Sequence, residues 1–107
     1  MDYYKQNKEF VIPDFRFNEI RKFVEGGLQD FSVSRLKAKM PWGVAVPDDE
    51  TQVMYVWFDA PIGYISMTSQ LTTDWEKYWK AKDSRIVHFI GKDNIVFHCL
   101  IFPAMCM

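Results

Sequence analysis

Two short segments of this chain hold the side chains best suited to binding a ligand. The first contains an indole, two small residues and a phenol: Trp57, Ala60, Pro61 and Tyr64. Aromatic rings around small residues can wall an apolar pocket, and their polar tips can orient what enters it. Core packing beside a capped helix accounts for the same residues, so the pattern alone leaves both interpretations open.

The second segment combines a glycine, a carboxylate and an imidazole: Gly91, Asp93 and His98. A glycine lets a ligand approach the backbone closely, and a carboxylate accepts hydrogen bonds from ribose hydroxyls. A turn glycine and a helix-capping aspartate are about as consistent with the pattern. A single imidazole on an apolar helix is more often a partly buried packing residue than a catalyst.

Each segment stands at the end of a run of apolar residues of strand length or directly after it. The runs are Val53–Phe58 and Ile86–Ile90, and both suit strands that are covered on two faces. Helical patterns over Ala60–Leu71 and Asp74–Lys82 lie between them. We therefore predict an α/β fold whose two strands are parallel and joined by a right-handed helical crossover, with ligands beyond the carboxyl ends of the strands.

Local signals place the ends of the helices in this half. Asp59 offers a side-chain cap, and Pro61 falls in a first helical turn, where its missing N–H does little harm. Asp93 stands at the head of a further apolar stretch of helical character. Asp59 and Asp93 are expected at the same edge of the sheet.

The first half is less regular. No period is visible over residues 1–12, which we expect to be irregular. From Asp14 onward, apolar residues recur at helical spacing until Gly26 and Gly27, a typical helix stop. The apolar residues of this helix are Phe17, Ile20, Phe23 and Val24. Extended or looping segments follow, at residues 31–35 and 42–47, and then the acidic loop at residues 48–50.

Composition excludes several classes of protein. The chain has 107 residues, 49% of them hydrophobic, which favours one globular domain or part of one. A net charge of -1 gives no electrostatic reason for strong RNA binding by this segment. No secretion signal and no apolar run near the ~18 residues of a membrane helix occur. We expect a protein of the cytoplasm, an organellar source being the alternative.

The cysteines and the end of the chain carry two further expectations. Cys99 and Cys106 lie in an apolar segment without the paired spacing of a zinc site, so we expect core thiols in a reducing compartment and no metal site. The chain ends at Met107 inside an apolar, helix-like run with no turn signal, which predicts a truncated domain.

Taken together, the motifs resemble those of methionyl-tRNA synthetases, which are class I aminoacyl-tRNA synthetases. The string Tyr55–Tyr64 (YVWFDAPIGY) resembles one strand-to-helix segment of that family nearly letter for letter. Phe89–Asp93 (FIGKD), followed by Phe97-His98 and Phe102-Pro103, resembles the next such segment. Residues 32–35, Trp42-Gly43 and Val46-Pro47 resemble the return from the inserted connective domain, which the isoleucine, valine and leucine relatives share.

The resemblance implies a role for each matching residue. Five residues match the positions that line the methionine side-chain pocket: Trp57, Ala60, Pro61, Tyr64 and His98. Two match the positions that meet the adenosine ribose of ATP: Gly91 and Asp93. Methionine and ATP are then the substrates, with Mg²⁺ expected to accompany ATP, and tRNA would be bound by parts of the parent enzyme outside this chain.

The resemblance also implies a division of the chain within a Rossmann-like nucleotide-binding fold. Residues 1–30 match the end of the connective insertion, and residues 31–107 match the second half of the catalytic domain. The two phosphate-handling signatures of the family, of the His-Ile-Gly-His and Lys-Met-Ser-Lys-Ser types, do not occur in the sequence. No catalytic residue is therefore assigned, and the isolated chain is expected to be inactive.

Two alternatives compete with a fragment of a methionine-specific enzyme. A stand-alone binding or scaffold module could keep the half-fold without its chemistry and use its apolar end as a docking surface. Another class I synthetase, such as one for leucine or valine, would share the fold. The string Ala60–Tyr64 argues against that second alternative.

Overall fold

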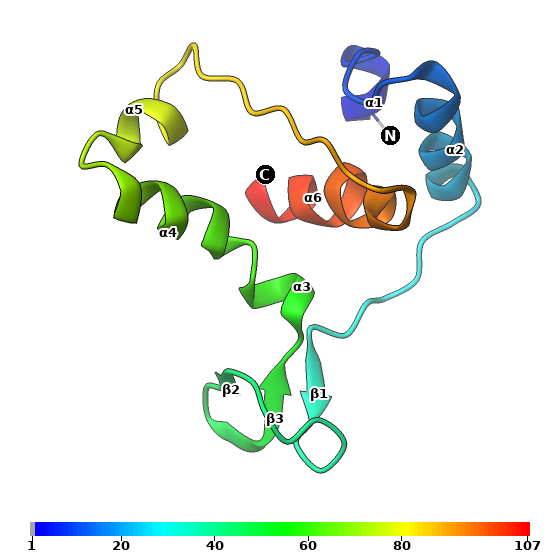
Figure 1. The fold of residues 1–107 in the computed structure, drawn as a ribbon. Helices are drawn as coiled ribbons and strands as arrows, with labels where there is room; N and C mark the ends of the chain where they lie inside the picture. Colours follow the sequence, from blue (N-terminus) through cyan, green and yellow to red (C-terminus); the bar gives the residue numbers. More distant parts are fainter. Residues whose placement is uncertain (1) are drawn as a thin grey trace. The chain divides into compact units, whose positions relative to one another are not determined.

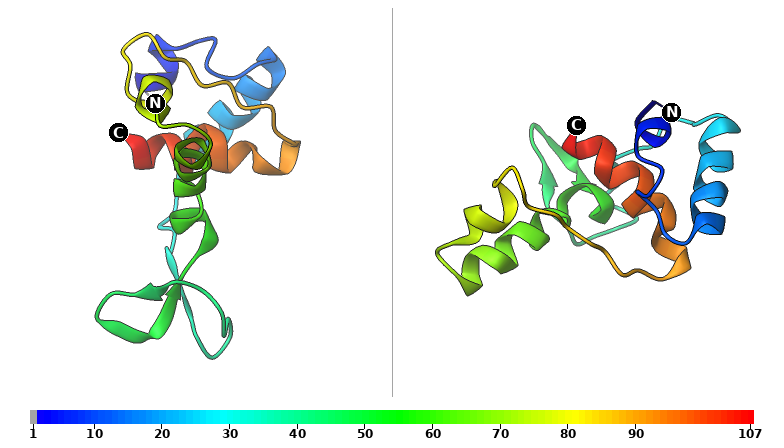
Figure 2. Two further views of the ribbon diagram at one scale, coloured as in Figure 1. Left: turned by 60° about the vertical axis from the view of Figure 1, so that its left-hand side comes forward. Right: turned by 90° about the horizontal axis from the view of Figure 1, so that it is seen from above.

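The computed structural model describes residues 2–107 as short helices and one small sheet (Figures 1 and 2). The chain forms two compact units. The first takes in the chain up to Phe31 together with His88–Met107, and the second consists of Ser32–Val87. Each unit is described by itself.

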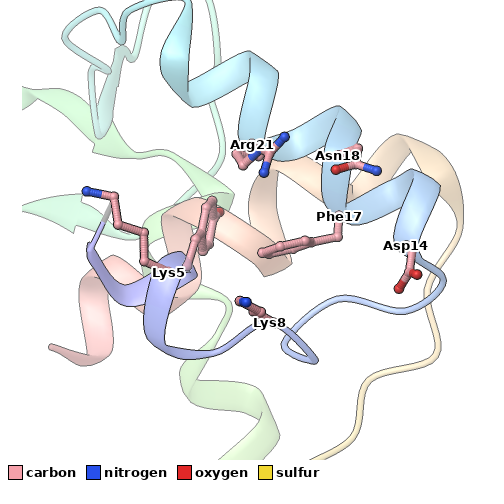
Figure 3. Close-up of a pocket in the computed structure, with 7 residues that line it drawn as sticks. Lys5, Lys8, Asp14, Phe17, Asn18 and Arg21 are labelled. Carbon is pink, nitrogen blue, oxygen red and sulfur yellow. The ribbon is translucent and has the colours of Figure 1, made fainter.

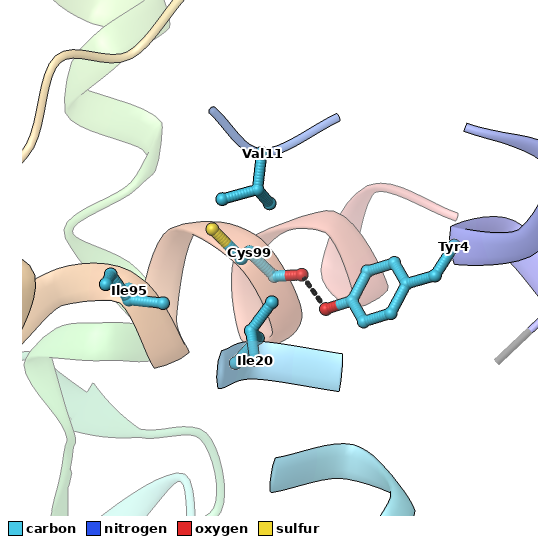
Figure 4. Close-up of a cluster of buried hydrophobic side chains, with 5 residues drawn as sticks. All are labelled: Tyr4, Val11, Ile20, Ile95 and Cys99. Carbon is cyan, nitrogen blue, oxygen red and sulfur yellow. Dashed lines mark hydrogen bonds between the residues drawn. The ribbon is translucent and has the colours of Figure 1, made fainter. Parts of the chain in front are cut away.

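Helices at both ends of the sequence build the first unit. They are α1 (Asp2–Gln6), α2 (Asp14–Glu25), the 3₁₀ turn η1 (Lys92–Asn94), the π-helical segment η2 (Phe97–Ile101) and α6 (Phe102–Cys106). Their core consists of five buried residues: Tyr4, Val11, Ile20, Ile95 and Cys99 (Figure 4). Ile20 is its most enclosed member, with 1% of its surface exposed. The core therefore joins residues from the two ends of the chain.

The predicted helix from Asp14 is confirmed. Helix α2 ends at Glu25, and Gly27 adopts a φ of 95°, a conformation that favours glycine. Phe17 and Val24 pack beside Ile20 against the core, whereas Phe23 stays 51% exposed.

Of the expectations for the two ends of the chain, one is wrong and the other is confirmed. The irregular start is wrong, because Asp2–Gln6 forms helix α1 and buries Tyr4, which propensity without a visible period could not reveal. The helical stretch near the end is confirmed, although it begins as a 3₁₀ turn and passes through a π-helical segment.

A three-stranded antiparallel sheet lies in the second unit. Its strands are β1 (Ser34–Leu36), β2 (Ala45–Val46) and β3 (Asp49–Met54), in the order β1-β3-β2. Val53, at the centre, pairs with Arg35 on one side and with Ala45 on the other. The extended character predicted for the segments around β1 and β2 is confirmed.

The strand predicted over Val53–Phe58 has the wrong bounds and the wrong partners. Strand β3 ends at Met54, and Val56–Asp59 forms the short helix α3. Strand β3 follows β2 through a tight turn in which Asp48 has a φ of 62°. Strands joined this closely can only pair antiparallel, because a parallel pair needs a long crossover. The part of the acidic loop from Asp49 onward belongs to β3.

Two further helices follow α3 and pack together (Figure 2). Helix α4 covers Ile62–Leu71 and helix α5 covers Trp75–Trp79, and the Trp79 indole Nε1 donates to Thr68 Oγ1 at 3.0 Å. Both were predicted, each with somewhat wider bounds. The predicted cap is wrong: Asp59 belongs to α3, and Pro61 stands at the N-cap of α4 without a side-chain hydrogen bond.

The predicted strand over Ile86–Ile90 is not formed. The predicted parallel pairing of this segment with Val53–Phe58 is therefore not formed either. The segment is extended without a strand partner, and Phe89 is 96% exposed. Apolar β-formers make a strand only where a neighbouring strand completes the hydrogen-bond ladder. Residues 2–107 thus have α/β content with an antiparallel sheet.

Candidate functional site

Trp57 lies on α3 in a stack of side chains. Its half-buried ring is 5.9 Å from the ring of Tyr55, at an interplanar angle of 51°. The Arg35 guanidinium carbon lies 3.9 Å from the centroid of the Tyr55 ring, a cation–π arrangement. The stack fixes Tyr55 between strand β1 and helix α3, and Trp57 next to it.

Ala60 and Pro61 connect α3 to α4, and Tyr64 lies in the first turn of α4. The N–H of Gly63 donates to the Ala60 carbonyl at 2.9 Å, and that of Tyr64 donates to the Pro61 carbonyl at 3.2 Å. Pro61 is buried, while the Tyr64 side chain is 37% exposed. A buried small residue and a partly open phenol therefore stand one turn apart on the same short segment.

Asp59, the last residue of α3, holds a buried carboxylate oxygen. Its Oδ1 has no hydrogen-bond partner among the residues that the structure describes. Buried polar atoms in proteins are nearly always paired, so this oxygen can accept a hydrogen bond from any donor that reaches it. From the sequence, we interpret Asp59 only as a helix cap. The feature that could have indicated a binding role is a carboxylate placed directly after an apolar run.

Gly91 and Asp93 lie around the 3₁₀ turn η1. The N–H of Asn94 donates to the Gly91 carbonyl at 3.0 Å and closes the turn. A Cβ added at Gly91 would meet nothing within 4 Å, and Asp93 is exposed. Both residues face open space that a ligand could reach.

His98 is the second residue of the π-helical segment, after Phe97, and is half-buried. Its Nδ1 lies 3.1 Å from the Asn94 carbonyl oxygen. If that nitrogen carries the proton, it donates to the carbonyl and leaves Nε2 as an acceptor. The ring of His88 lies against it, 5.1 Å away, and no spacing or motif predicts this contact.

The candidate residues fall into two groups. Trp57, Ala60, Pro61 and Tyr64 lie in the second compact unit, whereas Gly91, Asp93 and His98 lie in the first. Within each group, the residues lie on one short segment of the chain. That the three rings of Trp57, Tyr64 and His98 meet in one pocket stays a prediction.

A separate hollow of about 460 Å³ lies between α1 and α2 (Figure 3). Its lining residues are Tyr4, Lys5, Lys8, Asp14, Phe17, Asn18 and Arg21. Lys5 is paired with Asp2 at 3.1 Å, and Arg21 with Glu25 at 3.7 Å, so neighbouring carboxylates offset much of its positive charge. None of the residues predicted to bind methionine or ATP lines it.

Two further properties bear on the class of protein. Over residues 2–107, no three His, Cys, Asp or Glu side chains come together in a way that could hold a metal ion. Within the same range, every helix is too short or too polar to cross a bilayer.

Comparison with known proteins identifies the class as the class I tRNA synthetases. The whole chain, residues 1–107, matches the family described as tRNA synthetases class I (M), and the chain belongs to that family. It is 54% identical over 92 residues to the methionine–tRNA ligase of Porphyromonas gingivalis and 50% identical over 95 residues to that of Flavobacterium psychrophilum. These matches take in 83% of this chain but only 13% of each relative.

Solved structures agree with the sequence comparison. The methionyl-tRNA synthetase of Mycobacterium tuberculosis in complex with methionyl-adenylate is 41% identical, with a TM-score of 0.78. The match covers 99% of this chain and 20% of that one. The free state of the same enzyme gives a TM-score of 0.79. The predicted family membership is thereby confirmed.

Proposed function

We propose that this chain is a segment of a methionine–tRNA ligase, in which it forms the methionine side-chain pocket and the adenosine ribose site. The observation that carries the proposal is the similarity, over 99% of the chain, to a synthetase solved in complex with methionyl-adenylate. Methionyl-adenylate forms when the methionine carboxylate attacks the α-phosphate of ATP and displaces pyrophosphate. Methionine and ATP are accordingly the substrates, and tRNA is the acceptor.

Methionine recognition rests on shape and soft contacts, because a thioether has little hydrogen-bonding capacity. The segment from α3 into α4 offers suitable walls: the Trp57 ring, the small residues Ala60 and Pro61, and the Tyr64 phenol. His98 is the fifth member of the pocket. Selectivity over similar apolar amino acids would be on the order of 1–3 kcal/mol for each missing methylene.

Ribose recognition is assigned to Gly91 and Asp93. The exposed Asp93 carboxylate can accept hydrogen bonds from two neighbouring hydroxyls. The open space at Gly91 lets the sugar approach the backbone, where a side chain would intrude. Hydrogen bonds from the ribose to Asp93 and close approach at Gly91 suit a nucleoside. Binding the ribose in this way needs neither a phosphate group nor a metal ion.

The rest of the enzyme would supply what this segment lacks. Activation needs donors and positive charge placed around the phosphates, and ATP arrives with its Mg²⁺ as part of the substrate. We assign residues 1–30 to the end of the connective insertion and residues 31–107 to the second half of a Rossmann-like catalytic domain. In that domain, strands from elsewhere would pair with Ile86–Ile90. We place the enzyme in the cytoplasm.

A hybrid enzyme tests the proposal. The segment of the Porphyromonas gingivalis ligase that matches this chain at 54% identity is replaced by this chain's residues. We expect methionine-dependent ATP–pyrophosphate exchange by this hybrid enzyme, and little exchange with leucine or valine. A soluble, folded hybrid that exchanges with leucine as well as with methionine would contradict the proposed pocket.

A further inference from the structure

The ring of His98 is enclosed by other rings from two directions. Phe97, its neighbour in the sequence, packs edge-on at 4.9 Å and 89°, and Phe102, one turn further along the helix, lies 6.5 Å away. His88 approaches from the extended segment before the helices, at 5.1 Å and 51°. His88 is thus a contact that comes from outside the helical segment that carries His98.

His88 is itself held against the same helix. Its ring packs edge-on against Phe102, at 5.8 Å and 88°, as well as against His98. Phe97 and Phe102 stack on each other at 6.0 Å, which closes the group into one cluster of four rings. A change in His88 is therefore transmitted directly to the ring of His98.

The backbone holds the His98 ring at one atom, since its Nδ1 lies 3.1 Å from the Asn94 carbonyl oxygen. The ring of His88, 5.1 Å away, adds a contact from another segment of the chain. Partners of this kind commonly fix the rotamers of binding residues.

We propose that His88 is a positioning residue that holds the His98 ring in the orientation the methionine pocket requires. The inference rests on the proposed function, in which His98 closes that pocket. His88 touches no substrate and acts only through His98.

The charge of His88 supports this role. Burial, and secondarily the nearness of His98, lowers the pKa of His88 below its ordinary value of 6.5. At pH 7 the ring is therefore neutral and packs as an aromatic ring. Protonation of His88 in acid places a positive charge against the apolar ring of Phe102 and loosens the packing of His88 in the cluster.

The test uses the hybrid enzyme and compares the KM for methionine with that for ATP. His88→Ala is expected to raise the KM for methionine by on the order of tenfold and to leave the KM for ATP within about twofold. His88→Phe, which keeps a ring, should restore the KM for methionine and weaken its rise below pH 6.5. His88→Gln, which keeps polarity without a ring, should behave like alanine and serves if the alanine variant is unstable.

A double variant separates positioning from general damage. If His88 acts through His98, His88→Ala combined with His98→Ala raises the KM for methionine no further than His98→Ala alone. Independent, additive effects would overturn the inference, as would a His88→Phe variant no better than His88→Gln. If His98→Ala alone leaves the KM for methionine unchanged, it is the proposed function that fails.

Discussion

The hydroxyl of Tyr4 donates a hydrogen bond of 2.5 Å to the backbone carbonyl of Cys99. The two residues stand 95 positions apart in the sequence, and both belong to the core of the first compact unit (Figure 4). Burial raises the pKa of Tyr4 from 10.0 to about 12, and the neighbouring Cys99 thiol adds to the shift. This contact ties helix α1 to the π-helical segment η2.

Alkaline pH should lower the stability of the fold, because Tyr4 ionises. A folded-state pKa above the unfolded value stabilises the fold below pH 10, and this contribution is lost as pH rises through about 12. Tyr4→Phe should lower stability at neutral pH by about 0.5–1.5 kcal/mol and flatten the loss between these pH values. The measurement is urea unfolding from pH 8 to 12, with Tyr3→Phe, at a 39% exposed position, as the matched control. Equal pH profiles for the two variants would refute the assignment.

Substitution of Gly43 and of Gly63 by alanine should affect stability differently. A Cβ on Gly43 would stand 3.0 Å from the Cβ of the buried Val53, whereas one on Gly63 would meet nothing within 4 Å. Gly43→Ala is expected to cost about 1–3 kcal/mol by overpacking. Gly63→Ala, in helix α4, should be neutral or stabilising by up to about 1 kcal/mol. Thermal unfolding compares them, and a Gly63→Ala variant that is the less stable of the two would contradict the packing described.

The two thiols should differ in reactivity. Cys99 is buried, and burial raises its pKa above 9.0, while Cys106 is exposed. Because the thiolate is the reactive form, iodoacetamide at pH 8 should label Cys106 first and reach Cys99 only in denaturant. Peptide mass spectrometry after timed quenching distinguishes the sites. Cys99 labelled as fast as Cys106 in the native chain would show that this core is open.

The isolated chain should not activate methionine. The two phosphate-handling signatures of the family are absent from its sequence, so nothing is in place to stabilise the charge that develops on the phosphates. Methionine-dependent ATP–pyrophosphate exchange should match that of a mock-purified control. Exchange well above that control would disprove this expectation.

Local signals predicted the helices better than the strands. Helix α2 could be predicted because its apolar spacing and its terminal glycines act within a few residues. The run Ile86–Ile90 reads as a buried strand, but a strand needs neighbours, and none pairs with it among residues 2–107. The run Val53–Phe58 combined the end of β3 with the first three residues of α3, since both stretches are apolar.

The candidate site shows a similar division. Binding roles for Trp57, Tyr64 and Asp93 could be assigned from motifs, because each residue lies in a short contiguous string. The ring of His88 against His98 and the unpartnered oxygen of Asp59 could not, because they depend on packing between segments. Contacts of this kind leave no trace in spacing along the chain.

The central claim is that one segment binds the methionine side chain and another binds the ribose of ATP, and steady-state kinetics of the hybrid enzyme test it most directly. Tyr64→Ala or His98→Ala should raise the KM for methionine on the order of tenfold or more and change that for ATP little. Asp93→Ala should do the reverse. If Tyr64→Ala leaves the KM for methionine unchanged, or if Asp93→Ala raises both constants equally, these residues serve packing and the assignment of the two sites is wrong.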